Sequence, residues 1–227
     1  MKWLNQFFDF YLPRFCVSCK SKLTFSESFL CNICFNKIEK PDPLRIEHEF
    51  KRKFEPEKLI TEFASAFVFE KDKPLQHLIH SLKYEDNFNA GIYLGRKIGK
   101  LLLDKLTKWN PDLIIPVPLH RLKKAERGYN QSYFIAKGIK SVLNIPVDAN
   151  IIKRHRFTNT QTELSLEKRK ENIKHAFVIK KKKVVEGKNI IIIDDVITTG
   201  ATISECAALL KLNGAADLFA LSVAIAE

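Results

Sequence analysis

The chain has 227 residues, of which 45% are hydrophobic and 28% charged, and its formal net charge is +12. This length and hydrophobic content suffice for a buried core in one or two domains, and only 8 glycines and 9 prolines exclude a collagen-like or long low-complexity chain. A positive charge of this size favours polyanionic partners, although a solvated lysine-rich surface gives the same excess. No apolar run approaches the ~18–20 residues that span a bilayer, and residues 1–11 lack the apolar core of a signal peptide. We therefore expect a cytoplasmic protein without a transmembrane segment.

The N-terminal segment, residues 1–40, combines an aromatic stripe with two pairs of cysteines. The stripe, between residues 3 and 11, has helical spacing and is expected to dock onto the protein, with a membrane surface as the alternative. The cysteines follow the spacing Cys-x2-Cys-x11-Cys-x2-Cys and are Cys16, Cys19, Cys31 and Cys34. Two such pairs close a tetrahedral site with four thiolates and leave no open position for water, so we expect a structural Zn²⁺ ion. A redox Cys-x-x-Cys pair is the competing interpretation, and it explains only one of the two pairs.

Residues 41–60 are polar and contain prolines, which predicts a linker to a main domain over residues 61–227. That domain opens with an alternating strand over residues 63–69 and continues with two helical patterns. A second strand, over residues 112–117, ends between two prolines that favour a rigid turn. Later in the chain, residues 157–162 have the polar, unperiodic character of a lid. Residues 176–179 and 184–185 are expected to pair as a hairpin with a basic tip.

The most informative stretch covers residues 190–202. It begins with four consecutive isoleucines, which predict a strand buried on both faces of a parallel sheet. Asp194 and Asp195 follow at the carboxyl end of this strand, where ligands bind in open α/β sheets. A turn of small residues comes next, and a helical pattern then continues to Gly214, with Cys206 on its apolar face.

A strand, a threonine-rich turn and a helix N-terminus together predict an anion site, because free backbone N–H groups and the helix dipole converge there. The two carboxylates would repel a phosphate, but they can accept hydrogen bonds from the hydroxyls of a ribose ring. The stretch therefore predicts a site for a ribose 5-phosphate. The alternative is a buried strand that ends in a solvated Asp-Asp turn. Neither a Gly-x-Gly-x-x-Gly nor a P-loop motif is present, which excludes the dinucleotide and P-loop interpretations.

Residues 190–202 resemble the signature that binds 5-phosphoribosyl 1-diphosphate (PRPP) in type I phosphoribosyltransferases. Further segments narrow the resemblance to the ComF/GntX family of competence-associated, phosphoribosyltransferase-like proteins. These segments are Lys83-Tyr84, Val117-Pro118-Leu119-His120, Arg127-Gly128-Tyr129-Asn130-Gln131-Ser132, residues 161–165, Arg169 with Asn172, and Ala176-Phe177. The resemblance covers nearly the whole chain, including the four cysteines.

The resemblance implies an α/β fold with a type I phosphoribosyltransferase-like parallel sheet, flanking helices and an N-terminal zinc knuckle made by the four cysteines. It implies PRPP as ligand together with Mg²⁺. The 5-phosphate would lie on Thr198, Thr199, Gly200, Ala201 and Thr202, and the ribose on Asp194 and Asp195. The diphosphate would lie on the turn formed by Val117, Pro118, Leu119, His120 and Arg121. The candidates for a catalytic role are Asp194, Asp195, Arg127 and Lys83.

The family also implies a role in natural transformation, in the uptake or internalisation of single-stranded DNA, with other DNA-uptake proteins as possible partners. Clustered basic residues are the expected DNA contacts. They are Lys123, Lys124, Arg127, Lys153, Arg154 and Arg156. Two alternatives stay open: a stand-alone phosphoribosyltransferase acting on an unidentified acceptor, and a PRPP-sensing interaction protein without catalysis.

Overall fold

The fold is known from a computed structural model that describes residues 13–155 and 176–226. Within these residues, four parallel strands form one sheet in the order β1-β6-β5-β2, and two short antiparallel strands form a second sheet, β3-β4. The strands are β1 (Glu62–Val68), β2 (Leu113–Pro116), β3 (Ile152–Arg154), β4 (Phe177–Ile179), β5 (Ile190–Ile197) and β6 (Leu218–Ile225). The helices are α2 (Asn32–Asn36), α3 (Pro43–Lys53), η1 (Glu55–Glu57), α4 (Pro74–Tyr84), α5 (Phe88–Leu101), α6 (Leu103–Lys108), α7 (Arg121–Arg127), α8 (Gln131–Leu143), η2 (Lys182–Val184) and α10 (Ala201–Leu212).

Strand β5 lies between two hydrophobic layers, as its run of isoleucines predicts. All four isoleucines are fully buried. Ile191 and Ile193 contact the core on one face of the sheet, whereas Ile190 and Ile192 contact the core on the other. A strand with two buried faces needs apolar side chains at every position rather than at alternate ones. The sequence therefore places β5 inside the sheet, where β6 and β2 flank it.

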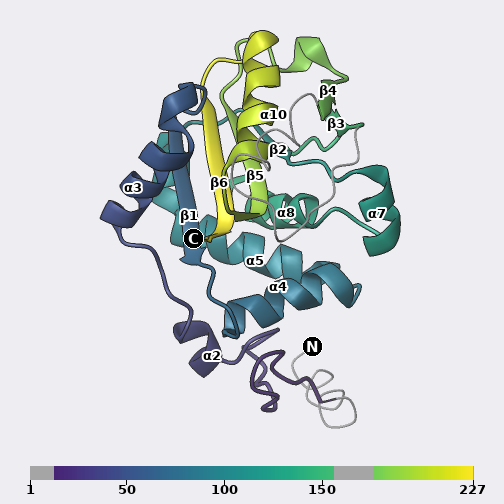
Figure 1. The fold of residues 1–227 in the computed structure, drawn as a ribbon. Helices are drawn as coiled ribbons and strands as arrows, with labels where there is room; N and C mark the ends of the chain where they lie inside the picture. The colour runs from purple at the N-terminus through teal and green to yellow at the C-terminus, as the bar shows by residue number, and fades with distance from the viewer. Residues whose placement is uncertain (1–12, 156–175, 227) are drawn as a thin grey trace.

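Helices cover both faces of this sheet (Figure 1). Helices α4, α5 and α8 pack on the face that contains Ile191 and Ile193. Helices α3 and α10 pack on the opposite face. Helices α5 and α8 cross closely because Gly95 and Gly138 meet at the contact. A Cβ atom on Gly95 would lie 2.0 Å from the carbonyl oxygen of Ile135, so no larger residue fits there. This crossing fixes α8 beneath the carboxyl end of β5.

The parallel sheet with flanking helices confirms the predicted fold class. Residues 41–60, predicted as a linker, contain helix α3, which Asp42 caps by accepting a hydrogen bond from the N–H of Arg45 at 2.7 Å. The predicted hairpin is wrong, because residues 177–179 pair with β3 and residues 182–184 form a 3-10 turn. The aromatic stripe and the predicted lid lie outside the described residues. No helix in the described part of the chain is long and apolar enough to cross a membrane.

Candidate functional site

The carboxylates of Asp194 and Asp195 lie in the last part of β5 and meet donors from the same helical layer. The hydroxyl of Ser132 on α8 donates to Asp194 Oδ1 at 3.0 Å, and Lys83 Nζ on α4 lies 2.6 Å from Asp195 Oδ2. In a regular strand, side chains three residues apart lie on opposite faces of the sheet. Ile193 and Val196 instead contact the same core, so the alternation of side chains is interrupted between them, at Asp194 and Asp195. Both acidic groups therefore open toward α4 and α8.

The two neighbouring carboxyls have opposite pKa shifts. Burial, reinforced by the negative charge of Asp195, raises the pKa of Asp194 to about 7. Burial alone would also raise the pKa of Asp195, but the ammonium group of Lys83 holds it below its usual value. Burial would likewise lower the pKa of Lys83, and the charge of Asp195 raises it instead. Lys83 and Asp195 therefore form an ion pair, and Asp194 is the member of the site that exchanges a proton near neutral pH.

The turn after β2 lies next to these carboxylates. The N–H of Val117 donates to the carbonyl oxygen of Ile193 at 2.9 Å, and the Asn130 side chain donates to the carbonyl oxygen of Val117, also at 2.9 Å. His120 is buried and caps α7, where its Nδ1 accepts from the N–H of Leu122 at 3.3 Å. This arrangement gives His120 a structural role at the start of α7, and it places the turn at residues 117–121 beside Asp194.

Residues 127–132 connect the same region to α4. The Tyr129 hydroxyl donates to the carbonyl oxygen of Leu82 at 2.6 Å, immediately before Lys83. The Arg127 guanidinium lies 5.6 Å from the ring of Tyr84 and donates to Gln131 Oε1 at 3.3 Å. Two buried nitrogen atoms, Arg127 Nε and Gln131 Nε2, make no hydrogen bond within the described part of the chain. Buried donors without partners are costly, so these two are suited to an acceptor-rich ligand.

The turn between β5 and α10 is the segment predicted to bind an anion. Gly200 begins α10 with a φ of 78°, in the left-handed region that favours glycine. The Thr199 hydroxyl accepts from the N–H of Ala201 at 3.3 Å. The first turn of α10 carries no acidic residue, so its free N–H groups and positive dipole end are not neutralised by a side chain of that turn.

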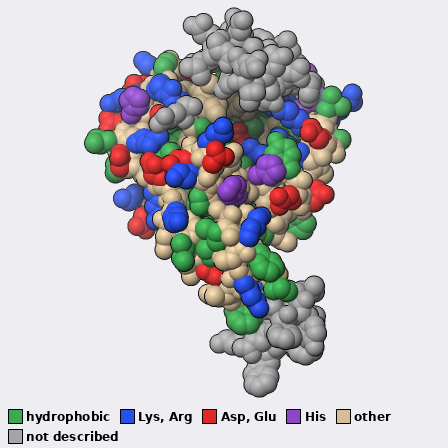
Figure 2. Space-filling view, turned by 60° about the horizontal axis from the view of Figure 1, so that its bottom comes forward, with side chains coloured by type: hydrophobic (Ala, Val, Ile, Leu, Met, Phe, Trp, Pro, Cys, Tyr) green, Lys and Arg blue, Asp and Glu red, His purple; other side chains and the backbone are tan. Residues whose placement is uncertain are grey.

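The two basic segments predicted to contact DNA line one cavity of about 840 Å³. Lys124 lies on one wall, and Lys153 and Arg154 lie on the other. Lys123 and Arg127 are not among its lining residues, and Arg156 lies outside the described residues. Sequence reasoning missed the aromatic part of the lining, which is Tyr129, Tyr133 and Phe134. On the molecular face drawn in Figure 2, by contrast, basic and acidic side chains are intermixed.

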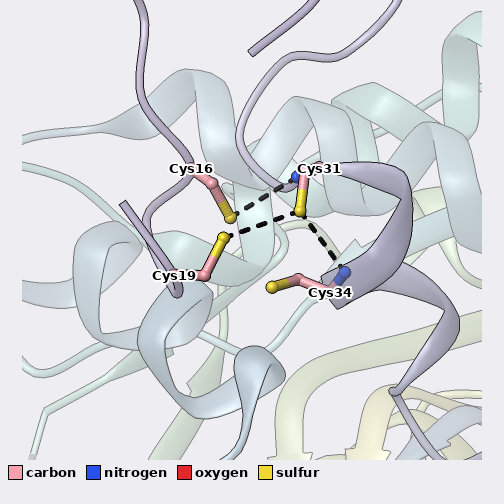
Figure 3. A group of neighbouring side chains, drawn as sticks. All are labelled: Cys16, Cys19, Cys31 and Cys34. Carbon is pink, nitrogen blue, oxygen red and sulfur yellow. Dashed lines mark hydrogen bonds between the residues drawn. The ribbon is translucent and has the colours of Figure 1, made fainter. Parts of the chain in front are cut away.

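The four cysteines of the N-terminal segment converge on one point (Figure 3). Their sulfur atoms all lie within 4.8 Å of one another, and the Sγ atoms of Cys19 and Cys31 are 3.7 Å apart. A tetrahedral Zn²⁺ site with Zn–S bonds of about 2.3 Å puts its sulfurs roughly 3.8 Å apart, whereas a disulfide needs about 2.05 Å. The N–H groups of Cys31 and Cys34 each point at a cysteine sulfur at 3.4 Å, which favours thiolates. The cluster therefore fits a metal ion.

Glu27 ties the loop between the two cysteine pairs to the start of helix α2. Its carboxylate accepts from the N–H and the hydroxyl of Thr24 and from the N–H of Asn32, at 2.6 to 2.9 Å. These hydrogen bonds lower the pKa of Glu27. Asn32 begins helix α2 directly after Cys31, so Glu27 sets the position of the second pair. The spacing of the cysteines contains no indication of this role.

Comparison with known proteins identifies the family to which this chain is similar. A family model described as "Phosphoribosyl transferase domain" matches residues 83–226. The chain is 38% identical over 149 residues to the "DNA utilization protein YhgH" of Escherichia coli K12, covering 63% of each chain. It is 34% identical over 150 residues to the "Competence protein F" of Haemophilus influenzae, covering 64% of this chain and 66% of that protein. The match thus spans less than two thirds of these relatives.

Two further similarities extend the comparison. The chain is 24% identical over 206 residues to the "Competence protein ComFC" of Bacillus subtilis, covering 89% of this chain and 80% of that one. Among solved structures, the purine phosphoribosyltransferase of Pyrococcus horikoshii matches 59% of this chain and 74% of its own, at 21% identity and a TM-score of 0.40.

Proposed function

Since this chain belongs to the phosphoribosyl transferase domain family and to the ComF group within it, we propose that it binds PRPP with Mg²⁺ and acts in the cytoplasm during natural transformation. In this role it handles incoming single-stranded DNA together with other DNA-uptake proteins. Its relatives carry names of competence and DNA utilization, which supports the biological role.

One observation carries the PRPP part of the proposal: an acidic pair, a half-buried lysine and a helix start whose N-cap residue is a glycine share one edge of the sheet. Asp194 and Asp195 lie in the last part of β5, and the turn to α10 begins three residues after Asp195. Lys83 reaches the same point from α4. This set supplies acceptors for ribose hydroxyls and donors for phosphate oxygens within one site.

The diphosphate would lie against the turn at residues 117–121, close to Arg127 and Gln131. Their unsatisfied donors support this assignment, because a diphosphate offers many acceptor oxygens. Mg²⁺ would bind mainly through these phosphate oxygens. It would neutralise the part of the negative charge of the diphosphate that the lysines and arginines leave unbalanced. A ribose hydroxyl that approaches Asp195 competes with Lys83, so binding would release Lys83 toward the diphosphate.

The transformation role is tested with Asp194→Asn/Asp195→Asn, which nearly preserves side-chain shape. In a competent host this variant should abolish transformation. A matched control is Asp112→Asn/Asp217→Asn, which removes two carboxylates at the opposite, amino edge of the sheet, before β2 and β6. If well-expressed Asp194→Asn/Asp195→Asn protein supports normal uptake and integration of DNA, the pocket is not used for transformation.

Catalysis is tested separately by following pyrophosphate release from PRPP and Mg²⁺ across candidate acceptors, including single-stranded DNA. Release that depends on one acceptor would identify a phosphoribosyltransferase and its substrate class. PRPP binding without release from any acceptor would instead favour the ligand-sensing alternative.

A further inference from the structure

Helix α3 ends beneath the turn that joins β5 to α10. Its last residue, Lys53, has a side chain that is only 2% exposed. The Lys53 ammonium group donates to the carbonyl oxygens of Thr198 and Ala226, the second at 3.2 Å. Each of these carbonyls directly follows the carboxyl end of a strand, β5 or β6. Lys53 therefore links the predicted phosphate turn to the carboxyl edge of the sheet, from the side of the turn that faces α3.

The third partner of Lys53 is Glu49, one helical turn earlier. Its carboxylate lies 2.9 Å from Lys53 Nζ and is only 8% exposed, and Arg52 donates to the same oxygen at 2.8 Å. An ammonium group has three N–H donors, and Glu49, Thr198 and Ala226 supply three acceptors. Burying a lysine is costly unless every donor is satisfied. With all three donors satisfied, the buried Lys53 side chain is held in one position, unlike a lysine on the surface.

The contact with Thr198 determines the direction of the next backbone N–H. A trans peptide is planar, and its C=O and N–H groups point in opposite directions. No cis peptide occurs among the described residues. Because the carbonyl oxygen of Thr198 points at Lys53, the N–H of Thr199 points away from α3, to the side where an anion would bind.

The turn also rests directly on α3. A Cβ atom on Gly200 would lie 2.9 Å from Phe54 Cε1 and 3.2 Å from Lys53 Cβ, so no side chain fits between them. Phe54 is fully buried, and its ring packs 5.5 Å from that of Phe63 on β1. Lys53 and Phe54 thus form a rigid platform under residues 198–200.

We propose that Lys53, held by Glu49, is a positioning residue that sets the 198–202 turn so that the Thr199 N–H is presented to the 5-phosphate of the ligand. The inference deepens the proposed PRPP site and rests on it. Lys53 lies outside the segment that matches the family model, residues 83–226. The N-terminal part of the chain would therefore complete the phosphate subsite.

The test uses Glu49→Gln/Lys53→Met, which removes both buried charges together and leaves neither unpaired. Calorimetry with Mg²⁺ should show the affinity for ribose 5-phosphate falling about tenfold or more, the effect of one lost hydrogen bond to a charged group. The affinity for pyrophosphate, which does not use the turn, should change less than about twofold. Hydrogen exchange at the Ala201 amide, which donates to the Thr199 hydroxyl within the turn, should become faster as the turn loosens. Lys53→Gln, which keeps an N–H donor, should retain more affinity for ribose 5-phosphate.

The control is Lys105→Met, because Lys105 donates to the backbone carbonyl of Phe63 at 2.9 Å near the amino edge of the sheet. It should leave both affinities unchanged. An equal loss for both ligands in the Lys53 variant, or no loss for ribose 5-phosphate, would overturn the positioning role while the PRPP proposal stands. If the wild-type protein binds neither ligand, the PRPP proposal fails. Unchanged exchange at the Ala201 amide in the Lys53 variant would then also reject Lys53 as the residue that holds the turn. Should the double variant not fold, Lys53→Gln and Glu49→Gln must each show a smaller loss of affinity that is still selective for ribose 5-phosphate.

Discussion

At the scale of single residues, identical side chains in adjacent positions have different properties because their neighbours differ. Asp195 faces the ammonium group of Lys83 and has a lowered pKa, whereas Asp194 accepts from the neutral hydroxyl of Ser132 and has a raised pKa. Two interacting carboxyls titrate as a unit, so the pair as a whole carries less than two negative charges near neutral pH. That reduced charge makes the site more tolerant of an anionic ligand.

The raised pKa of Asp194 predicts a pH-dependent stability. Between about pH 4 and 7 the folded state keeps a proton that the unfolded state releases. This group therefore contributes stability below pH 4 that is lost as the pH rises through about 7. The side chain that Asp194→Asn introduces cannot titrate, so this variant does not lose stability in that way. The free energy of unfolding of the variant, minus that of the wild type, should therefore increase as the pH rises, by at most about 1.4 kcal/mol per pH unit. Urea unfolding at pH 5, 6, 7 and 8 measures the difference; a constant difference would contradict the shift.

The Lys83–Asp195 pair should matter for folding because both groups are largely enclosed, at 22% and 15% exposure. Lys83→Met leaves the carboxylate of Asp195 unpaired and should lower the free energy of unfolding by about 2–3 kcal/mol. Lys51→Met is the matched control, since Lys51 pairs with Glu47 at the same 2.6 Å but both groups are exposed. Its cost should be much smaller, because water screens the charges of an exposed pair. Chemical denaturation that gives equal costs for both variants would show that burial does not decide the strength of the pair.

At the scale of elements, the four-cysteine knuckle illustrates what a short sequence pattern can establish. The spacing of the cysteines predicts a four-sulfur site, and the structure brings all four sulfurs together. The spacing does not reveal how the knuckle joins the protein. That contact depends on packing with α4 and α5, where Phe29 lies 5.4 Å from Tyr93 and the Ser18 hydroxyl lies 3.2 Å from His77 Nδ1.

We expect the purified, reduced protein to contain one Zn²⁺ ion per chain. Cys31→Ser should lose the metal and much of the solubility together, because a knuckle this small has little hydrophobic core of its own. Cys206→Ser is the control: Cys206 is equally buried but lies in α10, outside the cluster, and its replacement should leave the zinc content unchanged. Elemental analysis that finds no zinc in freshly reduced protein would reject the assignment.

The elements that the sequence predicted correctly are those with a local signature. The strand over residues 190–193 has its isoleucines, and Asp194 and Asp195 are neighbours in the chain. The pairing of β4 with β3 was missed because the two strands are 22 residues apart and each has only three residues. Lys53 was missed because its importance comes from tertiary contacts with Thr198 and Ala226, more than 140 residues away. Nothing in the polar sequence around it distinguishes it from a solvated lysine.

At the scale of the whole molecule, strand order brings distant motifs together. The last strand of the chain, β6, lies between β1 and β5 rather than at an edge. Helix α3 packs on β1, and its Lys53 reaches the turn after β5. Periodicity predicts that a strand exists but not which strands neighbour it, so this arrangement depends on packing that no single segment encodes.

The cavity between α7 and β3 brings together basic residues from two of the segments predicted to contact DNA. Single-stranded DNA should bind there weakly and without sequence preference, through phosphate contacts and stacking on aromatic rings. Lys124→Ala/Lys153→Ala removes one charge from each wall. It should reduce the slope of log affinity against log salt concentration by about 1.4, or roughly 0.7 for each lost phosphate contact.

Fluorescence anisotropy with a labelled oligothymidine, titrated at rising salt, measures that slope. Lys22→Ala/Lys37→Ala carries the same change in charge on the knuckle, away from the cavity, and should behave like the wild type. An affinity that does not respond to ionic strength would exclude these lysines as the DNA contact.

The central claim is that PRPP binds at the carboxyl end of β5, and calorimetric titration with PRPP and Mg²⁺ tests it most directly. The wild-type protein should bind, and Asp194→Asn/Asp195→Asn should bind at least about a hundredfold more weakly, since two acceptors for the ribose hydroxyls are lost. Asp112→Asn/Asp217→Asn, with the same change in charge at the opposite edge of the sheet, should bind as the wild type does. Equal affinity in Asp194→Asn/Asp195→Asn and the wild type, or no binding to the wild type, would contradict the account.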